Sequence, residues 1–303
     1  MARDVTSIAA SVHQRLLDRA RESGRPFNEL LQHFAIERFI YRLSKSRRAD
    51  SFILKGALML SVWSGATSRP TKDIDLLGRI DNSLEVITVA MKDVCEMDVE
   101  ADGMVFDGDS VTAARITEDA EYQGVRVRLK AALGNARVSI QVDVGIGDVV
   151  FPRPLDIEYP ALLDFPSARL KGYTMESTIA EKFHAMVILG VLNSRMKDFY
   201  DVWMLSRTYD LAGGILAEAI EKTFEARRTP LTAVPAVFEP SFANDGGKQV
   251  QWAAFVGKTM LNDAPQSFSE VAAAVTSLLK PPALALAESR PFSAMWKAPG
   301  PWA

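Results

Sequence analysis

The stretch Phe52-Ile-Leu-Lys-Gly-Ala-Leu-Met-Leu-Ser-Val-Trp-Ser-Gly-Ala-Thr-Ser-Arg-Pro-Thr-Lys-Asp-Ile-Asp-Leu-Leu-Gly78 decides the fold. At its end Asp73 and Asp75 alternate with apolar residues, which is the pattern of a half-buried strand. A strand rises ~3.3 Å per residue, so both carboxylates project from one face with Cα atoms about 7 Å apart. Such close anions repel each other, and a divalent cation is the simplest compensation.

Oxygen ligands of this kind suit Mg²⁺, which binds one or two carboxylates together with substrate phosphates. The pattern therefore predicts a metal site at Asp73 and Asp75. The alternative is that both are solvated residues at a strand end, or that one of them caps a helix.

The residues upstream of the acidic pair favour the metal site. Lys55-Gly56-Ala57 joins a short apolar run to a helix-like run over 58–63. A glycine at a strand-to-helix turn lets a phosphate approach bare backbone at a helix N-terminus, where amides and dipole favour anions. A glycine turn, a short helix and then Asp-x-Asp on the next strand is the order seen in the nucleotidyltransferase fold. We therefore expect Lys55, Gly56 and Ala57 to contact a nucleotide.

A third carboxylate is expected on a neighbouring strand. The run 137–145 alternates apolar and polar residues and places Asp143 near its end. Asp148, beyond Gly145-Ile-Gly147, is the competitor, although an aspartate in a loop after glycines is more often a turn residue. The sequence leaves the choice between Asp143 and Asp148 open.

Composition indicates a soluble globular protein. The 303 residues are 48% hydrophobic and 24% charged, enough to bury a sizeable core. A net charge of -3 excludes a uniformly basic nucleic-acid coat protein but allows a local basic cleft. The single cysteine, Cys95, cannot form an internal disulfide. With no secretory h-region and no apolar run near ~20 residues, these features predict a cytoplasmic protein without a membrane segment.

The periodicities predict an α+β protein with two lobes. Prolines at 152, 154, 160 and 166 mark the expected boundary, which gives a lobe over 1–160 and a helical lobe over 161–303. The tail from Pro281 is predicted to be disordered or to form an extended arm that lies on the surface or on a partner. Expected helices cover 7–46 (interrupted at 24–26), 58–63, 82–97, 174–189, 197–208, 211–226 and 268–279, and expected strands cover 52–54, 73–77, 104–106, 123–130 and 137–145.

The second expected helix has a basic end formed by Arg38, Arg42, Lys45, Arg47 and Arg48. Such a run is typical of a solvated face near a helix C-terminus. The other interpretation is contact with a polyanion such as an RNA backbone.

A second polar constellation lies in the C-terminal half. Lys182 lies on the helix expected from Thr174, and Asn193-Ser-Arg-Met-Lys-Asp-Phe-Tyr-Asp201 follows it. Asp198 and Asp201 are three apart and so share one helix face, with Arg195 and Lys197 just before them. One interpretation is a charged helix start. The other is a cluster that closes over a triphosphate held by the metal carboxylates of the other lobe.

Taken together, the motifs resemble those of the nucleotidyltransferase toxins of the AbiEii/AbiGii type, a family that includes the MenT toxins. The resemblance covers roughly residues 10–205. It implies an α+β fold with a DNA polymerase β-like nucleotidyltransferase lobe, a mixed sheet and a helical C-terminal lobe. The stretches that carry it are Glu37-Arg-Phe-Ile-Tyr-Arg-Leu-Ser44, Phe52-Ile-Leu-Lys-Gly56, Arg69-Pro-Thr-Lys-Asp-Ile-Asp-Leu76, Gln141-Val-Asp-Val-Gly145, Glu176 through Lys182, and Asn193 through Asp201.

The resemblance also implies an activity and its participants. It implies a type IV toxin that uses Mg²⁺ to move a nucleoside monophosphate from an NTP to RNA, with the tRNA 3′ end as acceptor and a cognate antitoxin as partner. Carried over by position, Asp73 and Asp75 are metal ligands, Lys182 contacts phosphate and Asp198 is the essential downstream aspartate.

The sequence departs from the family pattern at one position, and two other functions remain open. Gly56 matches the turn glycine of the family, but Ala57 stands where many nucleotidyltransferases place Ser or Gly, so a hydroxyl contact to phosphate is lost. Nucleotidylation of a protein or small molecule is the alternative within enzymology. A catalytically silent partner-binding module is the alternative outside it, and it predicts no metal-dependent NTP binding.

Overall fold

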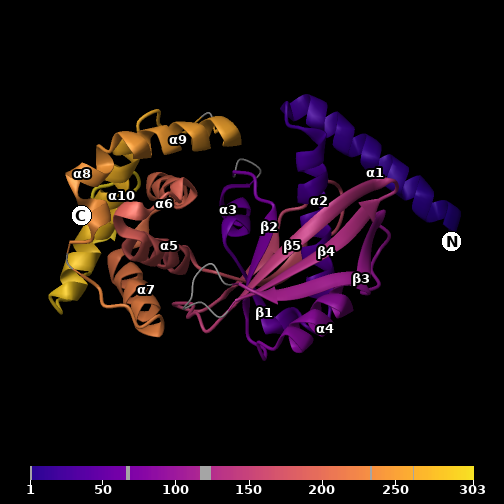
Figure 1. Ribbon diagram of the computed structural model, residues 1–303, viewed down its shortest axis with the longest axis horizontal. Helices are drawn as coiled ribbons and strands as arrows, with labels where there is room; N and C mark the ends of the chain where they lie inside the picture. The colour runs from indigo at the N-terminus through magenta and orange to yellow at the C-terminus, as the bar shows by residue number, and fades with distance from the viewer. Residues whose placement is uncertain (1, 66–68, 117–123, 233, 262) are drawn as a thin grey trace. The chain divides into compact units, whose positions relative to one another are not determined.

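The computed structural model describes residues 2–65, 69–116, 124–232, 234–261 and 263–303. The chain forms two compact units. The sheet unit comprises Met1–Gly147 and Leu155–Gly172, coloured mainly from indigo to magenta (Figure 1). The helical unit comprises Asp148–Pro154 and Tyr173–Ala303, coloured mainly from orange to yellow (Figure 1).

A seven-stranded mixed sheet in the order β3-β4-β5-β2-β1-β7-β6 forms the centre of the sheet unit. Strands β2 and β5 are parallel, as are β1 and β7, and the other neighbouring pairs are antiparallel. This confirms the predicted α+β class with a mixed sheet. The strands are β1 (Phe52–Lys55), β2 (Asp73–Gly78), β3 (Met104–Arg115), β4 (Val125–Leu133), β5 (Ala136–Ile146), β6 (Leu155–Tyr159) and β7 (Ala168–Gly172).

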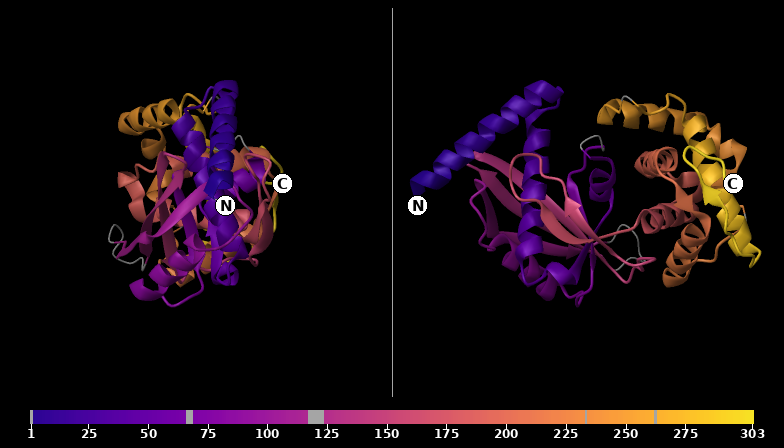
Figure 2. Two further views of the ribbon diagram at one scale, coloured as in Figure 1. Left: turned by 90° about the vertical axis from the view of Figure 1, so that its right-hand side faces the viewer. Right: turned by 180° about the vertical axis from the view of Figure 1, so that it is seen from behind.

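Helices α2 and α4 cover the apolar face of this sheet. Both contact the sheet and each other, and Figure 2 shows the same elements from two further sides. Ser83 begins α4 by accepting a hydrogen bond from the Val86 amide, as a helix cap does. Fully buried Phe34 and Phe39 of α2 supply the apolar surface that faces the strands. The helices of the unit are α1 (Ala2–Ser23), α2 (Phe27–Lys45), α3 (Ala57–Ser64) and α4 (Leu84–Cys95), with a 3-10 turn at Ala49–Ser51.

The helical unit packs around α10, which contacts α6, α7, α8 and α9. Thr174 caps α5 by accepting a hydrogen bond from the Ser177 amide. Strands β8 (Leu211–Ala212) and β9 (Met295–Trp296) form a small second sheet. The helices are α5 (Met175–Leu189), α6 (Met196–Thr208), α7 (Gly213–Ala226), α8 (Pro240–Ala243), α9 (Gly246–Thr259) and α10 (Phe268–Ala287), with 3-10 turns at Gly190–Leu192 and Ala236–Phe238.

The C-terminal tail differs from its prediction. Pro281 and Pro282 lie inside α10, which continues to Ala287. The burial of Leu278, Leu279 and Ala283 along this stretch outweighs the loss of the backbone hydrogen bonds that proline cannot donate. Further on, Trp296 is buried and donates a hydrogen bond to the Ser206 carbonyl. The tail is therefore folded onto its own unit.

Within the described ranges, α10 is the helix that is long and apolar enough to cross a membrane. A core helix satisfies the same criteria of length and composition. Phe268, Val271 and Val275 of α10 are buried inside the helical unit, as expected of a core helix.

The prediction of an exposed basic end on α2 is wrong for Arg38 and Arg42. Arg38 and Arg42 are buried, and both bind Asp102, with N···O distances of 2.9 and 2.7 Å. A buried arginine requires a nearby carboxylate to offset its desolvation, and Asp102 supplies it here. Arg47 and Arg48 at the helix end pair with Asp93 instead.

Candidate active site

The acidic pair lies on β2 as the alternation predicts. Asp73 and Asp75 are partly exposed, whereas Ile74 between them is fully buried. Because strand side chains alternate, both carboxylates project from the face opposite to Ile74. Two like charges therefore lie close together on one rigid element.

Gly56 lets the backbone come close to Asp75. It precedes α3 with φ of 69° and ψ of -151°, a conformation that favours glycine. A Cβ atom at this position would lie 2.0 Å from Asp75 Oδ2, so any larger residue would displace the carboxylate. The register also pairs Lys55, the last residue of β1, with Asp75. The predicted turn thus directly abuts the acidic pair, while Lys55 and Ala57 are both buried.

The third candidate carboxylate, Asp143, lies on β5 directly beside Asp75. Asp143 is held by Arg126 of β4, whose Nε and Nη2 donate to its two carboxylate oxygens, each at 2.9 Å. Asp148 belongs to the helical unit and binds Arg227, with Nη2 2.8 Å from Oδ1. We call Asp73, Asp75 and Asp143 the carboxylate edge.

The donor set at the carboxylate edge fits a hard cation only in part. Asp73 and Asp75 offer oxygen atoms from one face, with room that a Cβ at Gly56 would fill. Across the described residues, no three His, Cys, Asp or Glu side chains form a preassembled metal site. The fit therefore rests on Asp73 and Asp75, with Asp143 beside them but bound to Arg126.

The second constellation forms a buried ionic cluster in the helical unit. Lys182 Nζ on α5 lies 2.9 Å from Asp198 Oδ1 and 2.6 Å from Asp201 Oδ2, both on α6. Arg195 Nε makes an ionic contact of 2.7 Å with Asp198 Oδ2. We call these four residues the lysine cluster. The lysine side chain is 10% exposed and the two carboxylates at most 2%.

The neighbouring charges of the lysine cluster determine the protonation of Asp198. Burial alone would raise the pKa of Asp198, but the positive charges of Lys182 and Arg195 lower it to about 2. Asp198 is therefore ionised at neutral pH and holds Lys182 in one position. Asp201 also accepts a hydrogen bond from Lys182 Nζ, because residues three apart on α6 share a helix face.

The segment before α6 is braced from α9. Lys248, which sequence reasoning did not identify, donates to the carbonyls of Val191 and Asn193 at 2.9 and 2.8 Å. The Asn193 side chain in turn accepts a hydrogen bond from the Arg195 amide. Arg195 and Lys197 are exposed on this segment. No motif pointed to Lys248, because its partners are backbone carbonyls 55 and 57 residues away in sequence.

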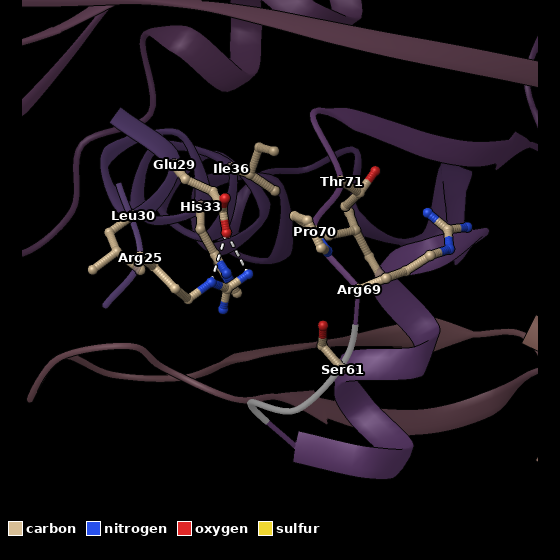
Figure 3. Close-up of a pocket in the computed structure, with 10 residues that line it drawn as sticks. Arg25, Glu29, Leu30, His33, Ile36, Ser61, Arg69, Pro70 and Thr71 are labelled. Carbon is tan, nitrogen blue, oxygen red and sulfur yellow. Dashed lines mark hydrogen bonds and ion pairs between the residues drawn. The ribbon is translucent and has the colours of Figure 1, made fainter. Parts of the chain in front are cut away.

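A pocket in the sheet unit is lined in part by residues that lie just before the acidic pair in the sequence. Arg25, Glu29 and His33 of the α2 region form one wall, and Ser61 and Thr71 lie across from them (Figure 3). Arg25 is ion-paired with Glu29. Burial and then the charge of Arg25 lower the pKa of His33 to about 4, so its imidazole is neutral at pH 7. This wall therefore carries little net charge.

The fold resembles that of a nucleotidyltransferase toxin of known structure. MenT4, a nucleotidyltransferase toxin from Mycobacterium tuberculosis, matches with a TM-score of 0.52 and 16% identity over 92% of this chain and 98% of that chain. JHP933 from Helicobacter pylori matches with a TM-score of 0.47 and 12% identity over 86% and 92% of the two chains. At 16% identity the likeness to MenT4 concerns the fold alone.

Sequence comparison identifies the family. None of the curated proteins compared with the chain matches it. The family described as "Nucleotidyl transferase AbiEii toxin, Type IV TA system" matches residues 38–274, well over half of the chain. This range contains both the carboxylate edge and the lysine cluster. The chain belongs to the AbiEii family of nucleotidyltransferase toxins of type IV toxin–antitoxin systems.

Proposed function

We propose that this toxin moves a nucleoside monophosphate from an NTP to an RNA acceptor, the 3′ end of tRNA, and so blocks translation. The observation that carries the proposal is the pair Asp73 and Asp75 on one face of β2, with the Gly56 turn against Asp75. Rigid paired carboxylates beside a glycine turn suit the binding of a cation that itself binds phosphates.

Asp73 and Asp75 would hold Mg²⁺, with Asp143 as the third ligand. When bound, Mg²⁺ supplies charge stabilisation for the attacking and leaving oxygens of an in-line displacement. The partly exposed position of the pair supports this assignment, because a substrate can reach it from solvent. The near contact with Gly56 supports it too, since it fixes where Asp75 lies.

The triphosphate requires positive groups and backbone amides. We assign contacts with the β- and γ-phosphates to Lys182, with Arg195 and Lys197 assisting at the rim. Lys55, Gly56 and Ala57 would meet the nucleotide at the start of α3. Asp198 contributes indirectly, because its 2.9 Å hydrogen bond keeps the Lys182 ammonium in place. Such positioning and charge stabilisation account for most of the catalysis in phosphoryl transfer.

The reaction is a nucleotidyl transfer. The acceptor hydroxyl oxygen forms a bond to the α-phosphorus, and the bond from the α-phosphorus to the bridging oxygen breaks. Pyrophosphate leaves with that electron pair, and the hydroxyl proton passes to solvent. Full-length chain incubated with each labelled NTP, Mg²⁺ and total RNA should label RNA, and sequencing of RNA 3′ ends should locate the addition on tRNA.

Other outcomes would redirect the proposal. Label in protein or a small molecule, with none in RNA, would move the acceptor to another class. The absence of metal-dependent NTP binding would favour a silent partner-binding module. In cells, we propose that the toxin acts in the cytoplasm, that its induction alone stops growth, and that co-expression of its cognate antitoxin restores growth.

A further inference from the structure

Four charged residues form a row across four neighbouring strands of the sheet unit. The register pairs Lys55 of β1 with Asp75 of β2, Asp75 with Asp143 of β5, and Asp143 with Arg126 of β4. Directly paired residues point to the same face, with Cβ atoms about 5 Å apart. The order of charges is therefore positive, negative, negative, positive, and each central carboxylate has a cation as its outer neighbour.

Arg126 engages both oxygens of Asp143 at once. The two N–H donors lie 2.9 Å from Oδ1 and Oδ2, the fork geometry in which arginine binds carboxylates most strongly. Both side chains are about one-fifth exposed, so water screens this pair only in part. Gln141 adds a longer contact of 3.5 Å to Oδ2. Both carboxylate oxygens of Asp143 therefore already accept a hydrogen bond from Arg126.

We infer that Arg126 controls whether Asp143 becomes a metal ligand, because its guanidinium and the metal compete for the same carboxylate. This inference rests on the proposed metal site at Asp73 and Asp75. It assigns Arg126 a positioning role: the arginine neutralises Asp143 until a bound cation, with its phosphates, takes over the carboxylate.

Arg128 provides a matched control. It lies two residues from Arg126 on the same strand and the same face, and its register partner is the neutral Gln141. Replacing either arginine with glutamine removes one positive charge from the same surface. Only Arg126→Gln also removes the two hydrogen bonds that the guanidinium donates to Asp143. A difference between the two variants therefore reports the competition rather than the general loss of charge.

The test is to titrate the full-length chain with Mn²⁺ alone and to measure the binding by calorimetry. R126Q should bind Mn²⁺ about 10-fold more tightly than wild type, whereas R128Q should change the affinity by less than about 2-fold. Adding D143N to R126Q should remove the gain. R126K keeps the positive charge but lacks the two-donor guanidinium, so its gain in Mn²⁺ affinity should be smaller. Thermal denaturation shows whether R126Q is folded, and R126K replaces it in the test if it is not.

Two results would overturn the inference. Equal affinities of R126Q and R128Q would mean that only net charge matters, and a gain that persists in R126Q/D143N would mean that Asp143 is not the contested ligand. If D73N abolishes Mn²⁺ binding while R126Q equals R128Q, the metal site stands and only the role of Arg126 fails. If neither wild type nor R126Q binds Mn²⁺, the proposed function fails as well.

Discussion

The carboxylate edge and the lysine cluster use the same kinds of side chain in opposite ways. Asp73 and Asp75 are partly exposed and lie on one face of β2. In the lysine cluster, Asp198 and Asp201 are buried and share Lys182. Water screens the charge of a partly exposed carboxylate, whereas a buried carboxylate requires a cation at contact distance. We therefore expect substitutions at the edge to affect chemistry, and substitutions in the cluster to affect chemistry and folding together.

The largest effect is expected at Asp73. Asp73→Asn keeps the shape of the side chain but removes the charge that a divalent cation requires, so nucleotidyl transfer should fall by about 1,000-fold or more. Because Asp73 is partly exposed and Ile74 supplies the buried contact, the melting temperature should change little. Transfer of a labelled nucleotide and thermal unfolding of the same preparation test this. Full activity of the variant would remove the metal assignment.

Asp201→Asn should behave differently. It leaves Lys182 with one carboxylate in a buried site, and breaking a buried ion pair costs about 3 kcal/mol or more of the free energy of unfolding. Urea unfolding measures this loss. Asp210→Asn is the control, because Asp210 pairs with Lys297 at an exposed position and its loss should leave stability nearly unchanged. A stable Asp201→Asn variant would show that the cluster does not depend on its second carboxylate.

Gly56 lies at the carboxylate edge, and its matched control is Gly65. Both have φ of 69° and ψ near -150°, but a Cβ at Gly65 would meet nothing within 4 Å, whereas at Gly56 it would meet Asp75. Both alanine variants should lose about 1 kcal/mol or more of stability to backbone strain. Gly56→Ala alone should reduce transfer, by about 10-fold to 100-fold, because Asp75 is displaced. Equal activities of the two variants would contradict this.

The last prediction concerns the pH dependence of stability. Burial, and then the charge of Arg227, lowers the pKa of His184 from 6.5 to about 4. Unfolding lets this histidine bind a proton between pH 6.5 and 4, so its contribution to stability is present above pH 6.5 and declines as the pH falls toward 4. The free energy of unfolding of wild type minus that of His184→Gln should therefore decrease from pH 7 to pH 4.5. Tryptophan fluorescence during urea unfolding can follow this, since four of the five tryptophans lie in the helical unit.

Sequence patterns predicted the elements whose periodicity is local. The alternation around Ile74 predicted β2, the break at Gly24–Pro26 separated α1 from α2, and helices α4, α5, α6 and α7 lie close to their predicted ranges. Strands β6 and β7 and helices α8 and α9 were not predicted. They are short or weakly periodic, so their local sequence patterns do not distinguish them from loops. The predicted strand at 123–130 begins at Gln123, which lies outside the described residues. The described strand β4 begins at Val125.

Sequence alone determined which residues carry charge and how they repeat, and from these followed the α+β class, the acidic pair and the family resemblance. Only the tertiary structure decided the partners of those charges. Arg38 and Arg42 bind Asp102 rather than solvent, Arg126 holds Asp143, and Asp201 shares Lys182 with Asp198. The reason is physical: strand and helix periodicities act over a few residues, whereas ion pairs depend on sheet register and helix packing, which join residues far apart in the chain.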